Sequence, residues 1–261
     1  MNELKGKVAI IGGGSKGLGK GCAVALAEKG CTIVLIARQE EKLKQTAKEI
    51  EALGVEVLPL TADMSKTADN QRIIDETVKA FGRIDILINN SGGPAAGNFK
   101  MFKDEDWQSA FESVLLYVIR MTQLSLPYMQ KQGWGRIINI ASLSVKEPAE
   151  TLVLSNVFRS GVVAFAKSIS KELIKSNITI NNLCPGAFKT DRAKELIAKA
   201  AADSGRTAAE VEAENKQKLP LGRYQEPDEL GAFVAYLCAD IAGGITGTTI
   251  QIDGGISNSL L

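Results

Sequence analysis

The stretch that decides the fold reads Gly12-Gly13-Gly14-Ser15-Lys16-Gly17-Leu18-Gly19, and it follows the apolar run of residues 8–11. Glycines at this spacing allow a tight turn and let the backbone come close to a phosphate. A helix that begins at Gly17 would direct its free N–H groups and partial positive charge toward the same place. The pattern therefore predicts a dinucleotide-binding βαβ unit, with a purely structural turn as the alternative.

Short apolar runs alternate with longer amphipathic segments along the rest of the chain. Strands are expected near residues 32–36, 55–60, 84–88, 136–141, 178–183 and 248–252, and helices near 17–28, 40–53, 70–81, 104–131, 149–175 and 227–238. The strands lack strict polar alternation, as expected when helices cover both faces of a parallel sheet. The pattern predicts an α/β fold of the Rossmann type, with a doubly wound parallel sheet of about seven strands and helices on both faces.

The length suits a single domain, because α/β folds often reach ~200–250 residues without splitting, and this chain has 261. Residues 1–261 are therefore interpreted as one dinucleotide-binding and catalytic domain. Residues 191–221 differ from the rest, because they are rich in Ala, Lys and Glu and interrupt the alternation of strands and helices. We expect them to form a lid-like insertion within the domain.

Composition narrows the possible functions. The chain contains 31 Lys and Arg, 30 Asp and Glu and no histidine, which excludes Ser-His-Asp hydrolysis and any histidine base. The near-zero net charge favours neither nucleic acid nor membrane as a partner. The cysteines are widely spaced, so no metal site is expected, and buried reduced thiols fit a cytoplasmic protein. No apolar run is long enough for a signal sequence or a bilayer span.

The end of the second predicted strand indicates which dinucleotide is preferred. An NAD site commonly places an acidic residue there for the ribose hydroxyls, whereas this chain has Ala37 followed by Arg38. Arg38 and Lys16 offer two cations to a 2′-phosphate. The sequence therefore favours NADP(H), with two solvated surface charges as the alternative.

Further motifs follow the later strands: Asp63-Met64, Asn89-Asn90-Ser91-Gly92, the run of residues 135–142 that ends at Ser142, Pro185-Gly186 with Thr190 beyond it, and residues 252–255. With the glycine loop, they make the chain resemble the short-chain dehydrogenase/reductase family over essentially its whole length. It looks most like members of the 3-oxoacyl-acyl-carrier-protein reductase type, although Gly12 replaces the usual Thr of the loop. The resemblance implies that the cofactor is held by Gly13, Ser15, Lys16, Gly17, Leu18, Gly19, Arg38, Asp63, Met64, Asn90, Ser91, Gly92, Pro185, Gly186 and Thr190.

The resemblance also implies a sheet of seven strands in the order 3-2-1-4-5-6-7. It implies a homotetramer or homodimer assembled through the two long helices near residues 104–131 and 149–175. The expected activity is NADP(H)-dependent reduction of a carbonyl in a small molecule, either 3-oxoacyl-like, such as an acyl thioester, or a related ketone.

The residues expected to perform the chemistry depart from the family pattern. Family members use an Asn, a Ser that polarises the carbonyl, a Tyr that acts as general acid, and a Lys that lowers the pKa of that Tyr and holds the ribose. Ser142 occupies the Ser position, but Ser155 stands in the Tyr position and Arg159 in the Lys position. Val114 falls where the Asn is expected.

These replacements leave the chemistry open. A serine hydroxyl is a much weaker acid than a phenol, and Arg159 stays charged and presents a planar fork. No tyrosine lies between Tyr128 and Tyr224, so no shifted copy of the motif is found nearby. Lys146 is a candidate substitute acid, or a solvated loop lysine. A reductase with an atypical site, a non-catalytic dinucleotide-binding sensor or scaffold, and a different reaction such as elimination or epimerisation all remain possible.

Overall fold

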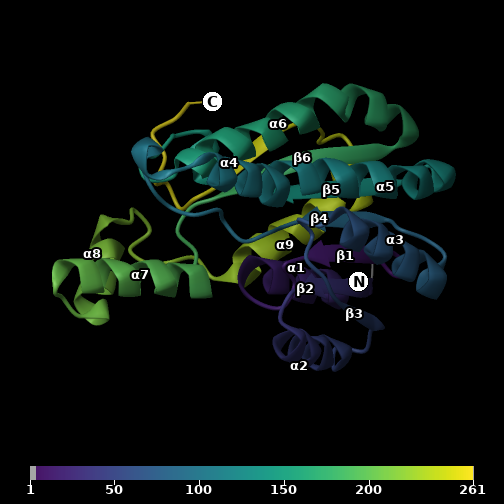
Figure 1. The fold of residues 1–261 in the computed structure, drawn as a ribbon. Coiled ribbons are helices and arrows are strands. Elements are labelled where there is room, and N and C mark those ends of the chain that lie inside the picture. The colour runs from purple at the N-terminus through teal and green to yellow at the C-terminus, as the bar shows by residue number, and fades with distance from the viewer. Residues whose placement is uncertain (1–3, 261) are drawn as a thin grey trace.

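A computed structural model describes residues 4–260, in which strands and helices alternate almost throughout (Figure 1). The boundaries lie within a few residues of those expected from the apolar periodicity. The strands are β1 Val8–Gly12, β2 Thr32–Ala37, β3 Val57–Thr61, β4 Ile86–Asn89, β5 Gly135–Ile140, β6 Ile178–Pro185 and β7 Thr249–Ile252. The helices are α1 Gly17–Glu28, α2 Glu40–Glu51, α3 Thr67–Phe81, α4 Asp104–Ala110, α5 Tyr117–Gln132, α6 Val153–Leu173, α7 Asp191–Ser204, α8 Ala208–Lys218 and α9 Pro227–Cys238.

The strands form one parallel sheet of seven in the order β3-β2-β1-β4-β5-β6-β7, which confirms the predicted fold class and the order that the resemblance implied. β1 pairs with β2 on one side and with β4 on the other, so the order of the strands reverses there. At such a reversal the connections leave in opposite directions and open a crevice beyond the carboxyl ends of the strands. The glycine loop lies at this point.

Two cores cover the two faces of the sheet. Alternate strand residues point to opposite faces, so Ile11 packs with α1, α2 and α9, while Ile10 packs with α3, α5 and α6. In Figure 1, α4, α5 and α6 lie in the upper part of the view, and α2 lies at the bottom beyond β3. Every residue of β1, β4 and β5 is buried, as predicted for strands covered on both faces.

A close glycine contact between α1 and α9 fixes the position of the glycine loop relative to the segment that precedes α9. A Cβ atom on Gly231 would lie 2.3 Å from the carbonyl oxygen of Gly21, and a Cβ on Gly21 would lie 2.5 Å from that of Pro227. The two backbones therefore approach more closely than any other residue type would allow. This contact holds the beginning of α9 beside α1.

The two long helices differ from their predicted extents. The first is not one regular helix, because a π-helical turn, Phe111–Leu116, separates α4 from α5. The second begins at Val153 and not near residue 149, because the carbonyl oxygen of Ala149 accepts hydrogen bonds from Leu152 N and Asn156 Nδ2 and closes a turn. Residues 149–152 therefore belong to the loop that carries Ser142 and Lys146.

Residues 191–221 are helical, as their composition indicated, and form a projection at one side of the molecule (Figure 1, left). Ile197 and Ala201 of α7 pack against Val211 of α8 in a small core of their own. The chain just before and just after the segment is held together, because Phe188 and Gln225 form an isolated parallel bridge. We refer to residues 191–221 as the α7–α8 segment.

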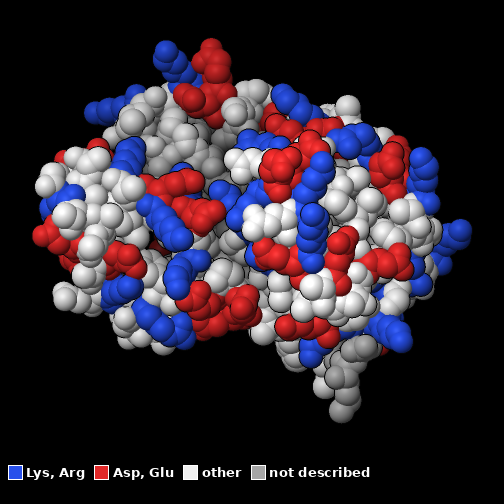
Figure 2. Space-filling model, turned by 90° about the horizontal axis from the view of Figure 1, so that it is seen from below, with Lys and Arg blue, Asp and Glu red and all other residues white. Residues whose placement is uncertain are grey.

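The surface charges are mixed in sign. On the face shown in Figure 2, blue Lys and Arg side chains and red Asp and Glu side chains are interspersed over the whole view. This distribution agrees with the formal net charge of +1. Among residues 4–260, no helix has the length and apolar character needed to cross a membrane.

Candidate active site

The glycine loop is closely packed against the end of β4. Asn90 Nδ2 donates a hydrogen bond to the carbonyl oxygen of Gly12 at 2.9 Å. Gly13 has a φ of 57°, and a Cβ atom there would lie 2.6 Å from Asn90 Nδ2. A Cβ atom on Gly19 would lie 2.3 Å from the carbonyl oxygen of Gly13. The loop therefore keeps its shape only with glycine at these positions.

This loop presents the beginning of α1 to the crevice. Lys16 is the N-cap residue and makes no side-chain cap hydrogen bond, so the first N–H groups of α1 remain available for an anion. Ser15 is buried, and its carbonyl oxygen accepts a hydrogen bond from Thr46 Oγ1 at 2.9 Å, which anchors the loop to α2. The cradle without side chains and the uncapped helix both fit the pyrophosphate of a dinucleotide.

The adenosine end of the predicted site has the residues expected from the sequence. Arg38 is exposed just beyond the end of β2, where its guanidinium is free to meet a phosphate. Asp63 Oδ1 accepts hydrogen bonds from the N–H and the hydroxyl of Ser65, which fixes that carboxylate beside the loop. Met64 lies against Gly12, since a Cβ on Gly12 would lie 2.8 Å from Met64 Cε. The same Cβ would lie 2.6 Å from the carbonyl oxygen of Asn90, and this backbone contact explains why a glycine stands here.

The Lys16 side chain was expected to lie with Arg38 at the end of β2, but it points to another part of the molecule. Its Nζ is 3.4 Å from Asp191 Oδ2, at the first residue of α7, and both side chains are about half exposed. Thr190 caps α7 by accepting a hydrogen bond from Ala193 N, and it lies against Gly17. The ion pair therefore links the glycine loop to the α7–α8 segment.

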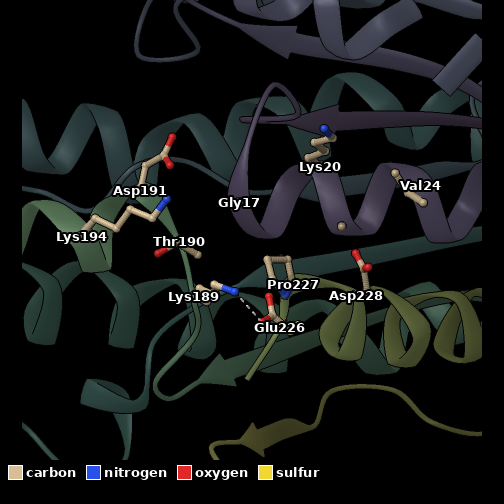
Figure 3. Close-up of a pocket in the computed structure, with 11 residues that line it drawn as sticks. Gly17, Lys20, Val24, Lys189, Thr190, Asp191, Lys194, Glu226, Pro227 and Asp228 are labelled. Carbon is tan, nitrogen blue, oxygen red and sulfur yellow. Dashed lines mark hydrogen bonds and ion pairs between the residues drawn. The ribbon is translucent and has the colours of Figure 1, made fainter. Parts of the chain in front are cut away.

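A pocket of about 240 Å³ opens between the beginnings of α1, α7 and α9. Figure 3 shows Gly17 at its rim, with Thr190 and Asp191 on one side and Glu226 and Pro227 below. Lys189 and Glu226 form an ion pair of 3.1 Å across the base of the α7–α8 segment. The pocket shares Gly17 with the glycine loop.

The predicted reaction centre lies at the carboxyl end of β5. Ser142 Oγ accepts a hydrogen bond from Ser144 N at 3.1 Å, so its own proton remains free to be donated. Ser155, which the resemblance places at the position of the family's Tyr, is buried and shares a hydrogen bond of 3.2 Å with Ser144 Oγ. The structure therefore brings Ser142 and Ser155 together around Ser144, which the sequence did not single out.

Arg159 is buried beneath this group of serines. Its Nη1 donates hydrogen bonds to the carbonyl oxygens of Ile140 and Ala141, at 2.6 and 2.9 Å. Burial lowers the pKa of the guanidinium, although nearby Tyr117 and Cys184 oppose this effect. Because Nη1 is taken up by the end of β5, Arg159 is held in one position and is not a mobile surface charge.

Lys146 is half-buried in the loop after Ser142 and lies near the Cys184 thiol. Burial raises the pKa of this thiol to about 11, and the Ser142 N–H, Lys146 and Arg159 partly oppose the rise. At neutral pH Cys184 is therefore a neutral thiol.

The structure adds a residue that sequence reasoning did not select. Tyr117, the first residue of α5, is 2% exposed, and burial raises the pKa of its phenol, while Ser91 and the charge of Arg159 oppose the rise. Tyr117 precedes Tyr128 in the chain and therefore lies outside the stretch between Tyr128 and Tyr224. Val114, one turn earlier, is buried and apolar, as its position in the sequence indicated.

A row of asparagine side chains lies across the same end of the sheet and was also not selected. Asn89 Nδ2 donates to Asn139 Oδ1, and Asn139 Nδ2 donates to Asn182 Oδ1, both at 2.9 Å. These bonds connect β4, β5 and β6 just before the strands end. They therefore fix the relative positions of Asn90, which holds the glycine loop, and Ser142.

Comparison with known proteins identifies the family. Residues 7–201 match the model of the family described as short chain dehydrogenase. The chain belongs to the short-chain dehydrogenase family. Its members among the similar proteins include the 3-oxoacyl-[acyl-carrier-protein] reductase FabG of Thermotoga maritima, 31% identical over 97% of this chain and 99% of the relative.

Other short-chain dehydrogenases act on different substrates. The 2-dehydro-3-deoxy-D-gluconate 5-dehydrogenase of Escherichia coli is 33% identical over 97% of this chain and 96% of the relative. The crystal structure of L-sorbose reductase from Gluconobacter frateurii, complexed with NADPH and L-sorbose, superposes with a TM-score of 0.95 at 30% identity over the whole of both chains. The chain thus shares the short-chain dehydrogenase fold with reductases of acyl and sugar substrates.

Proposed function

We propose that this short-chain dehydrogenase reduces a carbonyl group in a small molecule with NADP(H), through an atypical proton-donor site. The observation that carries the proposal is the combination of the phosphate cradle at residues 12–19 with a free hydroxyl proton on Ser142 at the end of β5. L-sorbose reductase and actinorhodin polyketide ketoreductase, both similar to this chain, have structures with NADPH. Relatives named as 3-oxoacyl reductases favour a 3-oxoacyl-like substrate or a related ketone.

Different residues of the crevice would bind the cofactor and polarise the carbonyl group of the substrate. Gly13, Gly19 and the N-terminus of α1 would hold the pyrophosphate, and Arg38 would hold the 2′-phosphate. When bound, the cofactor supplies the hydride. Ser142 would donate a hydrogen bond to the carbonyl oxygen of the substrate, where negative charge develops.

The cofactor preference is testable by calorimetric titration with NADPH and NADH. We expect NADPH to bind at least about tenfold more tightly, because a charge-assisted hydrogen bond contributes about 1.5–3 kcal/mol. Arg38→Ala should remove most of this difference and leave the affinity for NADH nearly unchanged. Lys42→Ala, an exposed cation on α2, is the matched control. Equal affinities of the native chain for the two cofactors would contradict the preference.

A turnover assay distinguishes a reductase from a non-catalytic dinucleotide-binding protein. We expect the protein to oxidise NADPH in the presence of a 3-oxoacyl thioester or a related ketone. The assay measures the loss of absorbance of the reduced nicotinamide. A chain that binds NADPH but consumes none with a panel of thioester, sugar and cyclic ketones would instead be a dinucleotide-binding sensor or scaffold. The replacement of the family's Tyr and Lys by Ser155 and Arg159 is the observation that favours this second candidate.

The remaining parts of the proposal concern the surroundings of the site. We propose that the α7–α8 segment acts as a lid over the substrate, since it begins at Asp191, which pairs with Lys16 of the glycine loop. A homodimer or homotetramer formed through α5 and α6 is proposed from the family resemblance. A cytoplasmic location and a small-molecule partner, in preference to nucleic acid or membrane, are proposed from the mixed surface charges and the buried cysteines.

A further inference from the structure

We propose that Ser155 and Arg159 are positioning residues, which attach α6 to the chain on both sides of Ser142 and so fix the Ser142 hydroxyl at the end of β5. The inference rests on the proposed reductase function, in which Ser142 donates a hydrogen bond to the carbonyl oxygen of the substrate. The resemblance places Ser155 and Arg159 where the family has its Tyr and Lys. In this chain both side chains are bonded to the segment that carries Ser142.

Both residues lie on the face of α6 that covers the sheet. They are four positions apart in the helix, so their side chains project from the same side, one turn from each other. Val162 and Ala166 continue this buried stripe and pack in the core between α6 and the strands. The first turns of α6 therefore place two polar side chains where the later turns place apolar ones. Polar groups buried in this way require hydrogen-bond partners, and the partners identify their role.

Arg159 holds the backbone directly before Ser142. Its Nη1 carries two hydrogens, and the acceptors are the carbonyl oxygens of Ile140 at 2.6 Å and Ala141 at 2.9 Å. The N–H of Ala141 donates to the carbonyl oxygen of Leu183 in β6 at 2.7 Å. Ala141 is therefore fixed from α6 and from β6 together, and Ser142 is the next residue in the chain.

Ser155 holds the backbone directly after Ser142. Its hydroxyl shares a hydrogen bond of 3.2 Å with the hydroxyl of Ser144, and both side chains are buried. Ser144 N donates in turn to Ser142 Oγ at 3.1 Å. Ser144 belongs to the 3₁₀ turn Leu143–Val145, which packs against α6. Ser155 thus fixes Ser144, and the N–H of Ser144 fixes the direction of the Ser142 hydroxyl.

The two attachments lie on either side of Ser142. Residues 140 and 141 precede it, residue 144 follows it, and all three are bonded to the same helix. A donor to a developing oxyanion acts only from a closely defined position, and a displacement of about 1 Å can lower the rate by about 10²-fold. Ser155 and Arg159 therefore affect kcat through Ser142, without contacting the substrate.

The first experiment measures kcat with a reducible ketone in Ser155→Ala, in Ser142→Ala and in the double variant. We expect Ser155→Ala to lower kcat by about 5–10-fold, the effect of losing one neutral hydrogen bond. It should have no further effect in the Ser142→Ala background, because the hydroxyl to be positioned is then missing. The KM for the ketone and the Kd for NADPH should stay unchanged, and Ser155→Thr, which keeps the hydroxyl, should keep most of the native kcat.

Ser160→Ala is the matched control, because Ser160 is exposed on the same helix and its hydroxyl donates to the carbonyl oxygen of Asn156. This variant should keep the native rate. A native kcat in Ser155→Ala would overturn the role of Ser155. An equal loss with and without the Ser142 hydroxyl would also overturn it, because Ser155 would then act on the substrate independently.

The second experiment replaces the guanidinium. Arg159→Met should lower kcat by about 10²-fold, with no further loss in the Ser142→Ala background, whereas Lys171→Met, an exposed cation on α6, should keep the native rate. Arg159→Lys retains a charged donor and should keep most of the native kcat. A native kcat in folded Arg159→Met, checked by circular dichroism, would overturn the role of Arg159. If Arg159→Met does not fold, Arg159→Lys decides: a tenfold rise in KM or in the Kd for NADPH at native kcat would assign Arg159 to the substrate or the cofactor instead.

The third experiment does not depend on turnover. Hydrogen exchange of the Ser144 amide, followed by nuclear magnetic resonance in the cofactor-free protein, reports on its bond to Ser142 Oγ. We expect faster exchange in Ser155→Ala and native exchange in Ser160→Ala. Unchanged exchange in Ser155→Ala would overturn the positioning role, whether or not the protein reduces a ketone. Faster exchange in a protein that consumes no NADPH with any ketone would support the attachment and contradict only the reductase function, so the two failures are distinguishable.

Discussion

Gly19→Ala is expected to abolish tight binding of NADPH. A Cβ atom at this position would lie 2.3 Å from the carbonyl oxygen of Gly13 and 2.8 Å from Asn90 Nδ2, so the loop must move away from the end of β4. The displaced backbone would lose N–H contacts with the pyrophosphate. Each charge-assisted hydrogen bond contributes about 1.5–3 kcal/mol, so the loss of two corresponds to about 10²–10⁴-fold weaker binding. Calorimetric titration with NADPH measures this directly.

The control for this substitution is Gly244→Ala, in the connection before β7. Gly244 has no positive φ, and an added Cβ atom there has nothing within 4 Å. This variant should bind NADPH as the native protein does. If Gly19→Ala bound NADPH with native affinity, the glycine loop would not be the phosphate cradle, and residues 12–19 would be a structural turn.

The second large effect is expected for Ser142→Ala. Its hydroxyl accepts a hydrogen bond from Ser144 N, and the remaining proton is available to the carbonyl oxygen of a substrate. Removal of one donor to a developing oxyanion lowers kcat by about 10²–10³-fold. The Kd for NADPH should change little, because the loss falls on the transition state and not on cofactor binding. Steady-state kinetics with the preferred ketone, together with NADPH titration, tests both statements.

Ser168→Ala is the matched control for Ser142→Ala. Ser168 is exposed on α6, and its hydroxyl donates to the carbonyl oxygen of Ala164 in the same helix. We expect a native rate in this variant. A native rate in Ser142→Ala as well would mean that another hydroxyl polarises the carbonyl, and Ser144, which is hydrogen-bonded to Ser155, would be the next position to change.

Local signals in the sequence were sufficient for the fold and for the shape of the glycine loop. The alternation of apolar and amphipathic runs predicted the covered parallel sheet, because each period depends only on neighbouring residues in the chain. The spacing of glycines in residues 12–19 predicted the turn between β1 and α1, and the structure shows that a Cβ atom at Gly13 or Gly19 would clash. Strand order came from the resemblance to the family and could not be read from periodicity.

The reaction centre could be predicted only where its residues are close in sequence. Ser142, Ser155 and Arg159 were selected by their spacing, and the structure brings Ser142 and Ser155 together around Ser144. Lys16 was expected beside a phosphate but is paired with Asp191, more than 170 positions away along the chain. No pattern within the glycine loop indicates a partner at that separation.

By itself, the sequence determined the βαβ beginning of the chain, the glycine loop at its first turn, and the spacing of Ser155 and Arg159 on one helix. These features depend on residue types at short spacing, because the sterics of a turn and the burial of one helix face involve residues that are close together in the chain. Only the tertiary structure decided that Lys16 pairs with Asp191 and that Asn90 binds the glycine loop. The second contact forms because the order of the sheet brings the end of β4 beside the end of β1. Such a meeting of distant segments depends on packing across the sheet, which local periodicity does not encode.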